Sequence, residues 1–390
     1  HIDKMSDTQE PKRKNIADGT TLRKEKRRKW EAKQERKSQS ELKRKERDTW
    51  FQEHSAFATL VTGDDVCDMA QHFKNRGKEL GIETSDEHKE LAVSLAPYMD
   101  IQEKNENSPI LPPEAGRLYI AEGTETVRVL LQQYSKKSHL QLDRIDIQSI
   151  FVKPSVLFDP PVKLLTDVFQ GLADNAAPRG VSPGFNVLVG ESENVLSGVA
   201  GFPITRGALA CGKVPLDRTD EWLNNYLGKK LQARESCRIL ALDGICDTAN
   251  LGSMIRTASA LGVNVIVLSS DTCDAWYRRS IRVSMGHVFL VPIVRVESLT
   301  GFLSRWNTIT SYAAVVQKED SVALHTIPPS GVPSAWCCVF GNEGNGISKE
   351  VLESCTNKLR IEMIDGVDSL SVPIACGVLL HGLREREQSN

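Results

Sequence analysis

Three segments in the last third of the chain combine small, polar and charged residues in patterns that suit chemistry. The first, DGICDTANLGSMIR, places Asn250 at the beginning of an expected helix and Arg256 about two turns into it. The second, GNEGNGIS, carries Glu343 among three glycines directly after an apolar run. The third, DGVDSLSVPIACGVLL, brings Ser369 and Ser371 to the start of an apolar helix. Together these segments indicate a binding or catalytic site, provided that the fold brings them together.

Each segment also has a purely structural explanation. Asn250 stands where a helix N-cap is expected. Arg256 suits a structural ion pair, and Ser371 followed by Pro373 suits the opening of a helix. The glycine spacing G-x-x-G-x-G is neither a dinucleotide fingerprint nor a Walker A loop, since it has no Lys. Glycines let a backbone approach a ligand closely, but this spacing alone identifies none.

The three segments follow apolar runs that predict strands. Strands are expected at 238–245, 264–270, 288–296, 311–317, 335–341 and 357–363, and helices at 250–262, 348–355 and 371–386. Continuous apolar strands alternating with helices are typical of a parallel sheet that is covered on both faces. In such a sheet ligands bind at the carboxyl ends of the strands, which is where the polar segments stand.

A second α/β pattern precedes this one. Strands are expected at 117–123, 147–155, 185–192 and 207–215, with helices at 124–134 and 161–172. We therefore divide the chain into five parts: a basic disordered arm (1–50), a weakly structured linker with a short helix at 87–98 (51–112), a small α/β domain (113–215), a connecting helix (216–235, centred on 221–235) and a C-terminal domain (236–390).

Charge and cysteine content exclude several classes. The chain of 390 residues has a formal charge of −2, but residues 1–50 alone hold 17 Lys and Arg against 10 Asp and Glu. Nine cysteines without a C-x-x-C motif argue against a disulfide scaffold and against a zinc or other metal site. No apolar run is long enough for a membrane helix or a secretory signal. We expect an intracellular protein with no membrane partner.

The basic arm has almost nothing to bury except Trp30, so we expect it to be disordered or transiently helical. Three roles stay open for it: a solubilising tail, a phosphate-contacting arm or a nuclear-import signal. A basic arm of this kind suits a protein of the nucleus or nucleolus. The cytoplasm and an organelle are the other compartments that we consider.

The ordered motifs N-x-G-x-x-x-R-T (250–257), G-N-E-G-x-G-I (341–347) and D-S-L-S-V-x-x-A (368–375) resemble the three motifs of the SpoU/TrmH family. The segment 273–292, with R-x-S-x-G, is similar to that family's intervening sequence. Residues 117–215 more loosely resemble the small substrate-binding domain that often precedes it, through Y-I-A-E-G and G-x-L-A.

The resemblance implies a fold and an activity. The fold is α/β, with a parallel sheet and a C-terminal trefoil knot (SPOUT-like), and the working unit is a homodimer. The activity is methylation of a ribose 2′-hydroxyl in RNA with S-adenosyl-L-methionine, on ribosomal RNA in preference to transfer RNA. The motif positions imply a cofactor pocket lined by Gly341, Asn342, Glu343, Gly344, Ile361, Met363, Ser369 and Leu370.

The resemblance also implies a catalytic cluster of Asn250, Arg256 and Glu343, to which we add Ser369 and Ser371. The family proposal makes Arg256 the general base. A free guanidinium is a poor base because its pKa lies far above neutral pH, so we prefer a phosphate clamp that lowers the hydroxyl's pKa. Glu343 would orient Arg256 or Asn250. Ser371 stands where the family has Asn, and 361–363 reads I-E-M in place of I-P-M.

Three further arginines between the first two motifs, Arg278, Arg279 and Arg282, are candidates for binding the RNA backbone, and a solvated helix face is the alternative. The departure at Ser371 also leaves another function open. The chain could be a weak or inactive RNA-binding or ribosome-assembly factor that retains the fold.

Overall fold

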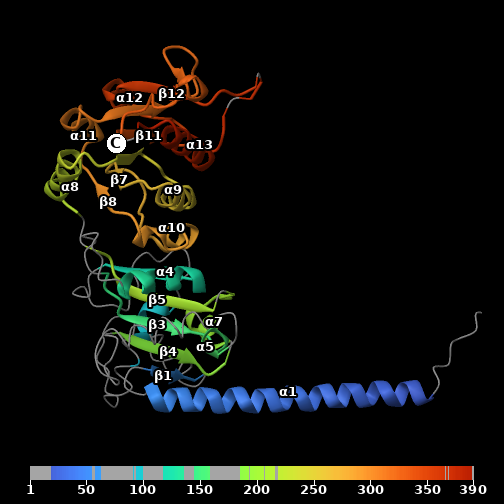
Figure 1. Ribbon diagram of the computed structural model, residues 1–390. Helices are drawn as coiled ribbons and strands as arrows, with labels where there is room; N and C mark the ends of the chain where they lie inside the picture. The colour runs from blue at the N-terminus through green and yellow to red at the C-terminus, as the bar shows by residue number, and fades with distance from the viewer. Residues whose placement is uncertain are drawn as a thin grey trace, which may run out of the picture. The chain divides into compact units, whose positions relative to one another are not determined.

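The computed structural model describes residues 19–54, 58–62, 91, 94–99, 117–135, 145–158, 185–192, 194–205, 207–215, 218–364, 366–367 and 369–388. The chain divides into two units, His1–Glu53 and His54–Asn390, whose elements are drawn in Figure 1. Among the described residues, no helix is long and apolar enough to cross a bilayer.

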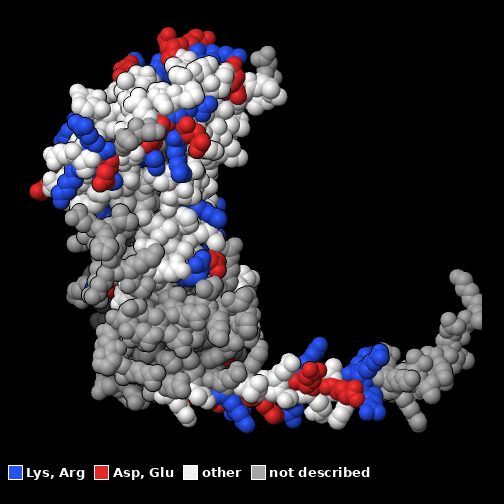
Figure 2. Space-filling model, viewed as in Figure 1, with Lys and Arg blue, Asp and Glu red and all other residues white. Residues whose placement is uncertain are grey.

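The first unit consists of helix α1 (Gly19–His54), which is 36 residues long. This differs from the disordered arm that the composition predicts. The segment is rich in Lys, Arg, Glu and Gln, which are good helix formers, and it contains i,i+4 ion pairs such as Arg27–Glu31 at 2.8 Å. Figure 2 shows Lys and Arg side chains interspersed with Asp and Glu along α1. The helix is therefore stabilised within itself, while Trp30 stays 61% exposed.

The small domain of the second unit is built on a five-stranded sheet of order β1-β4-β3-β5-β2. Its strands are β1 (Ala58–Val61), β2 (Leu118–Glu122), β3 (Ser149–Val152), β4 (Asn186–Gly190) and β5 (Ala208–Lys213), and its helices are α4 (Thr124–Ser135), α5 (Pro154–Phe158) and α7 (Val195–Ala200). β5 runs antiparallel to both of its neighbours, β3 and β2, and the other pairs are parallel. The helix predicted at 161–172 lies outside the described residues.

The segment that we predicted as a linker contributes to this domain. β1 pairs in parallel with β4, and the 3-10 helix η1 (Ala96–Tyr98) follows two helical residues. Leu95 and Tyr98 are fully buried in the small domain's core, and the Tyr98 hydroxyl donates to the Ser149 carbonyl at 2.8 Å. The boundary at 113 is therefore too late, because four-residue strands and single turns are too short to show a period in the sequence.

The C-terminal domain contains a seven-stranded parallel sheet of order β10-β12-β9-β11-β6-β7-β8. The strands are β6 (Cys237–Asp243), β7 (Val265–Leu268), β8 (Ile293–Arg295), β9 (Thr310–Ala314), β10 (Val322–Ala323), β11 (Ala335–Gly341) and β12 (Asn357–Arg360). The parallel sheet confirms the predicted fold class. The trefoil knot stays a prediction.

Helices cover both faces of this sheet (Figure 1). They are α8 (Asp220–Gln232), α9 (Thr248–Ala260), α11 (Leu299–Arg305), α12 (Lys349–Ser354) and α13 (Val372–Glu385). The short helix α10 (Arg278–Val283) packs against α9 and against β2 of the small domain. Alternate residues of β6, including Ile239 and Ala241, pack against α8, α11 and α12 in one core. Helix α13 packs on α9 and β11 in the other layer.

The predicted run 288–296 is not one strand. A 3-10 helix, η3 (His287–Phe289), follows Gly286, which has a φ of 80°, and only β8 pairs with the sheet. Pro292 lies between η3 and β8 and has no backbone N–H, so it cannot donate a hydrogen bond to a neighbouring strand. The strand therefore begins only after it. The connecting helix predicted at 221–235 is confirmed as α8.

Candidate active site

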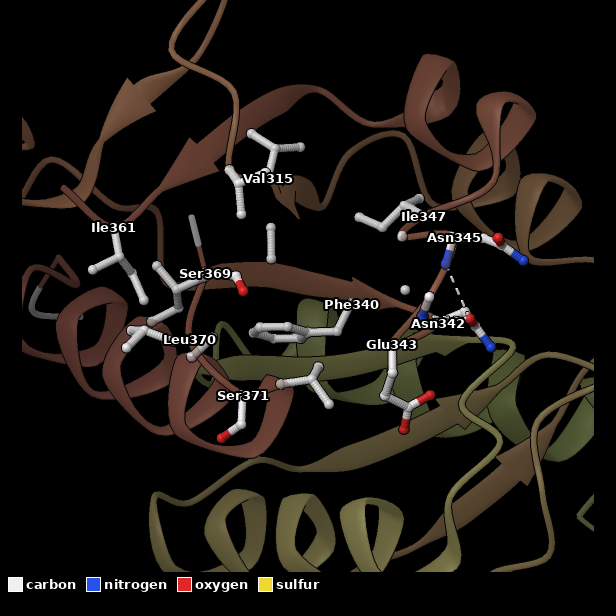
Figure 3. Close-up of a pocket in the computed structure, with 18 of the residues that line it drawn as sticks. Val315, Phe340, Asn342, Glu343, Asn345, Ile347, Ile361, Ser369, Leu370 and Ser371 are labelled. Atoms are coloured by element: carbon white, nitrogen blue, oxygen red, sulfur yellow. Dashed lines mark hydrogen bonds between the residues drawn. The ribbon is translucent and has the colours of Figure 1, made fainter. Parts of the chain in front are cut away.

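Three neighbouring strands end around one cavity of about 670 Å³. β9, β11 and β12 lie side by side and run in the same direction, so their carboxyl ends meet at one edge of the sheet. The segments that follow them, together with the start of α13, line the cavity, and Figure 3 shows Phe340 pointing into it. Parallel topology thus brings together residues that are far apart in the sequence.

The glycine turn after β11 has no room for side chains at its first position. A Cβ on Gly341 would lie 2.1 Å from the backbone of Gly346 and Ile347. Gly346 has a φ of 72°, a conformation that favours glycine. The two ends of the turn, Gly341 and Gly346, therefore pack against each other through their backbones. The residues between them line the cavity.

Asn342 fixes this turn from within. Its Oδ1 accepts hydrogen bonds from the backbone N–H groups of Gly344 at 2.8 Å and Asn345 at 3.1 Å (Figure 3). Its Nδ2 donates to the Gly244 carbonyl at 2.7 Å. Gly244 follows β6, so the amide ties the glycine turn to the first motif.

The first motif reaches the glycine turn through Asn250. Asn250 Nδ2 donates to Glu343 Oε1 at 2.9 Å, and the backbone N–H of Cys246 donates to Glu343 Oε2 at 3.4 Å. Asn250 is not the N-cap. Asp247 caps α9 by accepting from the N–H groups of Ala249 and Asn250 at 2.6 and 2.9 Å. The Asn250 side chain is thereby left to bind Glu343.

The cavity is lined by every residue that we predicted for the cofactor pocket. These residues are Gly341, Asn342, Glu343, Gly344, Ile361, Met363, Ser369 and Leu370. Asn250 and Ser371 from the predicted catalytic set line it as well. Sequence reasoning missed the segment after β9, 314–317, whose only signal was that its strand ends at the same sheet edge.

Arg256 is the exception among the predicted catalytic residues. It is exposed on α9, six residues and about 9 Å along the helix axis from Asn250, and it is not among the lining residues. Within the described part of one chain, no carboxylate pairs with it. Burial, and secondarily the positive charge of Arg256, lower the pKa of His287 in η3. A single chain therefore brings Asn250 and Glu343 together but leaves Arg256 on a surface nearby.

The three arginines predicted for RNA lie on α10, at the contact with the small domain. Arg278 Nη1 donates to Glu122 Oε2 at 2.8 Å, and Arg282 Nη1 donates to Glu122 Oε1 at 3.4 Å. Arg278 also lies over the Phe202 ring, 4.8 Å from its centre. Glu122 is buried, so two of the three cations have a structural partner, whereas Arg279 is exposed. RNA binding by these residues stays a prediction.

Comparison with known proteins shows which family this chain resembles. The family model described as the SpoU rRNA Methylase family matches residues 238–381. The chain is 32% identical over 204 residues to an uncharacterized tRNA/rRNA methyltransferase of Mycobacterium tuberculosis, covering 49% of this chain and 63% of that protein. It is 30% identical over 167 residues to the 23S rRNA (guanosine-2′-O-)-methyltransferase RlmB of Photorhabdus laumondii, covering 43% of this chain and 67% of that protein.

A further relative is the 23S rRNA (guanosine(2553)-2′-O)-methyltransferase RlmP of Bacillus subtilis, 29% identical over 154 residues, which cover 38% of this chain and 58% of that protein. The chain thus spans about three fifths of the length of several relatives that it matches. A solved RNA 2′-O ribose methyltransferase matches with a TM-score of 0.53 and 19% identity, over 84% of this chain and 99% of that chain. The match extends the likeness in fold across both domains of the second unit, and the chain belongs to the SpoU rRNA methylase family.

Proposed function

We propose that the protein transfers a methyl group from S-adenosyl-L-methionine to a ribose 2′-hydroxyl of RNA. The observation that carries the proposal is the cavity where three strand ends converge, with Asn250 bound to Glu343 at its edge. The relatives in Photorhabdus and Bacillus are named for 2′-O-methylation of guanosine in 23S rRNA. These names favour ribosomal over transfer RNA as the substrate, and a compartment in which ribosomes are made or assembled.

The residues around the cavity fit this cofactor. A cavity of about 670 Å³ lies within the range typical of small-molecule sites. Apolar side chains such as Phe340, Ile361 and Leu379 suit an adenosine moiety, and the close-packed glycine turn brings backbone polar groups to the surface. Glu343 is the one charged side chain among the described lining residues, and a carboxylate suits a sulfonium cation.

The chain's own residues would then orient the target and handle its proton. When bound, S-adenosyl-L-methionine would supply an already activated methyl group, so the protein's task is to align the ribose hydroxyl with the methyl carbon and to assist the loss of the hydroxyl proton to solvent. Glu343 holds the amide nitrogen of Asn250 and thereby leaves Asn250 Oδ1 to accept a hydrogen bond from a hydroxyl. The guanidinium of Arg256 would bind a phosphate of the target bidentately, which would lower the pKa of the neighbouring hydroxyl.

The homodimer is part of this proposal. Residues of the loop before α13 and of its outer face are apolar and exposed: Ile364 at 80%, Leu370 at 38%, Ile374 at 57% and Val378 at 39%. Large apolar side chains exposed on one helix and the segment before it are typical of an interaction site. Thr257, next to Arg256, lies against Gly377 of α13, so a second copy on this face would lie close to Arg256. We propose that dimerisation brings Arg256 to a cavity.

Isothermal titration of the purified protein with S-adenosyl-L-methionine tests the first half of the proposal, and we expect saturable binding. Mapping of 2′-O-methyl groups in RNA from cells with and without the protein tests the second half. We expect a site in ribosomal RNA to lose its methyl group in the cells that lack the protein. Cofactor binding with an unchanged methylation map would instead support an RNA-binding assembly factor, and absence of binding would refute the proposal.

A further inference from the structure

Two cysteines lie near Glu343, at the edge of the cavity, and have no role in the proposed chemistry. Cys246 stands in the turn between β6 and α9, and Cys273 stands in the loop after β7. Among the described cysteines, Cys246 alone is exposed, Cys273 and Cys355 are half-buried, and the others are buried. An oxidant in solvent would therefore meet Cys246 first.

The backbone places the two cysteines at a spacing that allows a bond. The N–H of Cys273 donates to the carbonyl of Ile245, the residue before Cys246, at 2.8 Å. β6 and β7 pair in parallel, and in a parallel pair the residue whose N–H donates lies opposite the residue after the acceptor. This bond therefore indicates that Cys273 lies opposite Cys246, across a gap of roughly the 5 Å that separates adjacent strands. Disulfides form between Cα atoms about 4.4–6.8 Å apart. Burial raises the pKa of the Cys273 thiol to about 11, and the negative charge of Glu343 adds to this effect.

Cys246 contacts the residues that build the proposed site. Its Sγ accepts a hydrogen bond from Asn342 Nδ2 at 3.1 Å, and its backbone N–H donates to Glu343 at 3.4 Å. Asp247, the next residue, caps the helix that carries Asn250. A displacement of Cys246 would therefore be transmitted to Asn342, Glu343 and Asn250.

The Cys273 side of the pair is the better anchored of the two. The guanidinium of Arg295 donates to the carbonyls of Ser269 and Thr272 at 2.7 Å each and to those of Ser270 and Cys273 at 3.1 Å each. These four bonds hold the loop 269–273 to β8. Formation of a bond between the thiols would consequently draw the turn at Cys246 toward Cys273, rather than the reverse.

We propose that Cys246 and Cys273 are a peroxide-sensitive pair whose disulfide weakens the cofactor site. Cys246 sulfur attacks a peroxide oxygen, the O–O bond breaks, water leaves and Cys246 becomes a sulfenic acid. Cys273 sulfur then attacks Cys246 sulfur, the S–O bond breaks, and the hydroxyl leaves as water with the Cys273 proton. In total two thiols are oxidised by two electrons, and one hydrogen peroxide is reduced to two waters. The effect on the cofactor rests on the proposed function.

The bond itself is tested by peptide mass spectrometry of the full chain. The reduced protein is treated with hydrogen peroxide, blocked with N-ethylmaleimide and digested with trypsin, which separates the two cysteines at Arg256. We expect the two neighbouring peptides to be joined and to separate on reduction with dithiothreitol. In Cys273→Ser the reaction should stop at a dimedone-reactive sulfenic acid on Cys246. The matched control Cys355→Ser, which removes another half-buried thiol, should form the same joined peptides as the wild type.

The consequence is tested by titration of the oxidised and reduced proteins with S-adenosyl-L-methionine. Loss of a hydrogen bond to Asn342 or Glu343 predicts about fivefold weaker binding after oxidation, restored by dithiothreitol and absent in Cys273→Ser. Absence of the joined peptides, or unchanged affinity in protein that contains them, would overturn the proposal. If the reduced protein binds no cofactor, both the proposed function and the proposed effect of the disulfide on the cofactor site are refuted. The peptide masses still show, independently of cofactor binding, whether the disulfide forms.

Discussion

At the scale of single residues, the carboxylate of Glu343 is where the first and second motifs meet. It accepts from the side chain of Asn250 and from the backbone of Cys246, and both contacts come from the segment between β6 and α9. Hydrogen bonds to a charged group are stronger than those between neutral groups. Glu343 is therefore well suited to hold Asn250 in one orientation at the edge of the cavity.

Glu343→Gln tests this role. The amide keeps the shape of the side chain but replaces one accepting oxygen with a donor, so Asn250 loses a charged partner. We expect methyl transfer to fall by about 100-fold, with a change in the free energy of unfolding below about 1 kcal/mol because the side chain is exposed. The measurements are single-turnover methylation and chemical denaturation. Glu353→Gln in the exposed Lys349 pair of α12 is the control and should keep full activity.

The role of the Arg256 side chain is tested by variants that remove its positive charge or keep it. In Arg256→Ala we expect cofactor affinity to be retained and methyl transfer to fall at least about 100-fold. Burial, the larger cause of the low pKa of His287, stays in this variant, but the pKa should rise part of the way toward its ordinary value because the neighbouring positive charge is gone. Calorimetry, a methylation assay and an NMR titration of His287 measure the three effects. Arg256→Lys keeps the charge and should keep the low pKa, and wild-type turnover in Arg256→Ala would remove this residue from the mechanism.

At the scale of elements, the glycine turn after β11 depends on close backbone packing. Gly341 contacts Gly346 and Ile347 without space for a methyl group, whereas Gly228 in α8 has nothing within 4 Å of where its Cβ would be. The two positions therefore differ in their need for glycine. One is required by the fold, and the other only weakens a helix.

Gly341→Ala should destabilise the protein by about 1–3 kcal/mol because the turn must open to admit the methyl group. Binding of S-adenosyl-L-methionine should weaken at least about tenfold, since the same turn lines the cavity. Gly228→Ala should raise the free energy of unfolding by up to about 1 kcal/mol and leave binding unchanged. Thermal unfolding and calorimetry compare the two variants, and equal stability for both would contradict the packing argument.

The contact between α10 and β2 is the second feature at this scale. Glu122 accepts from two arginines of α10, and its side chain is only 9% exposed. Tyr119 of the same strand lies against Trp276 and Phe289, with ring centres 6.2 and 5.2 Å apart. A buried carboxylate with two cations beside an aromatic cluster fixes the small domain to the C-terminal domain.

Glu122→Gln should release part of this contact. Loss of the buried charge leaves Arg278 without its counterion, and we expect destabilisation of about 1–3 kcal/mol and faster proteolysis between the domains. Glu125→Gln, which removes the exposed carboxylate paired with Arg128, should cost less than about 1 kcal/mol and is the control. Denaturation and limited trypsin digestion measure the difference, and identical digestion patterns would show that the ion pairs do not hold the domains.

At the scale of the whole molecule, the exposed apolar residues at α13 are the strongest sign of self-association. Apolar residues Ile374 and Val378 lie one turn apart on the exposed face of α13, and Leu370 and Ile364 are exposed in the segment before the helix. The opposite side of α13 is buried against α9 and β11. A helix whose two sides are both apolar is expected to be covered on both.

Ile374→Glu should therefore produce a monomer. A charge in the middle of a dimer interface is costly to desolvate, so the variant should sediment as a single chain and lose methyl transfer while its thermal unfolding stays close to that of the wild type. Lys349→Glu on α12, which lies on the other face of the sheet, should leave the association state unchanged. A dimeric and active Ile374→Glu would refute the proposed interface.

The sequence by itself determined the parallel α/β class and most of the segments that line the cavity, all but the one after β9. Long apolar runs separated by helices predict buried parallel strands, and polar residues at the ends of such strands predict a site, because these patterns depend on neighbours along the chain. The turn at Gly341 and the residues around Ser369 were found in this way. The five-part division was less successful, since β1 and η1 are too short to leave a pattern.

The tertiary structure decided which side chains bind one another. Asn250 and Asp247 are both good N-caps, and only the structure shows that Asp247 caps α9 while Asn250 binds Glu343, 93 residues away. Arg278 has the sequence context of an RNA contact, yet its partner is Glu122 from another domain. Such pairings depend on the strand order and on how the domains pack. Neither the strand order nor the packing of the domains can be read from the spacing of residues along the chain, because both bring together segments that are far apart in the sequence.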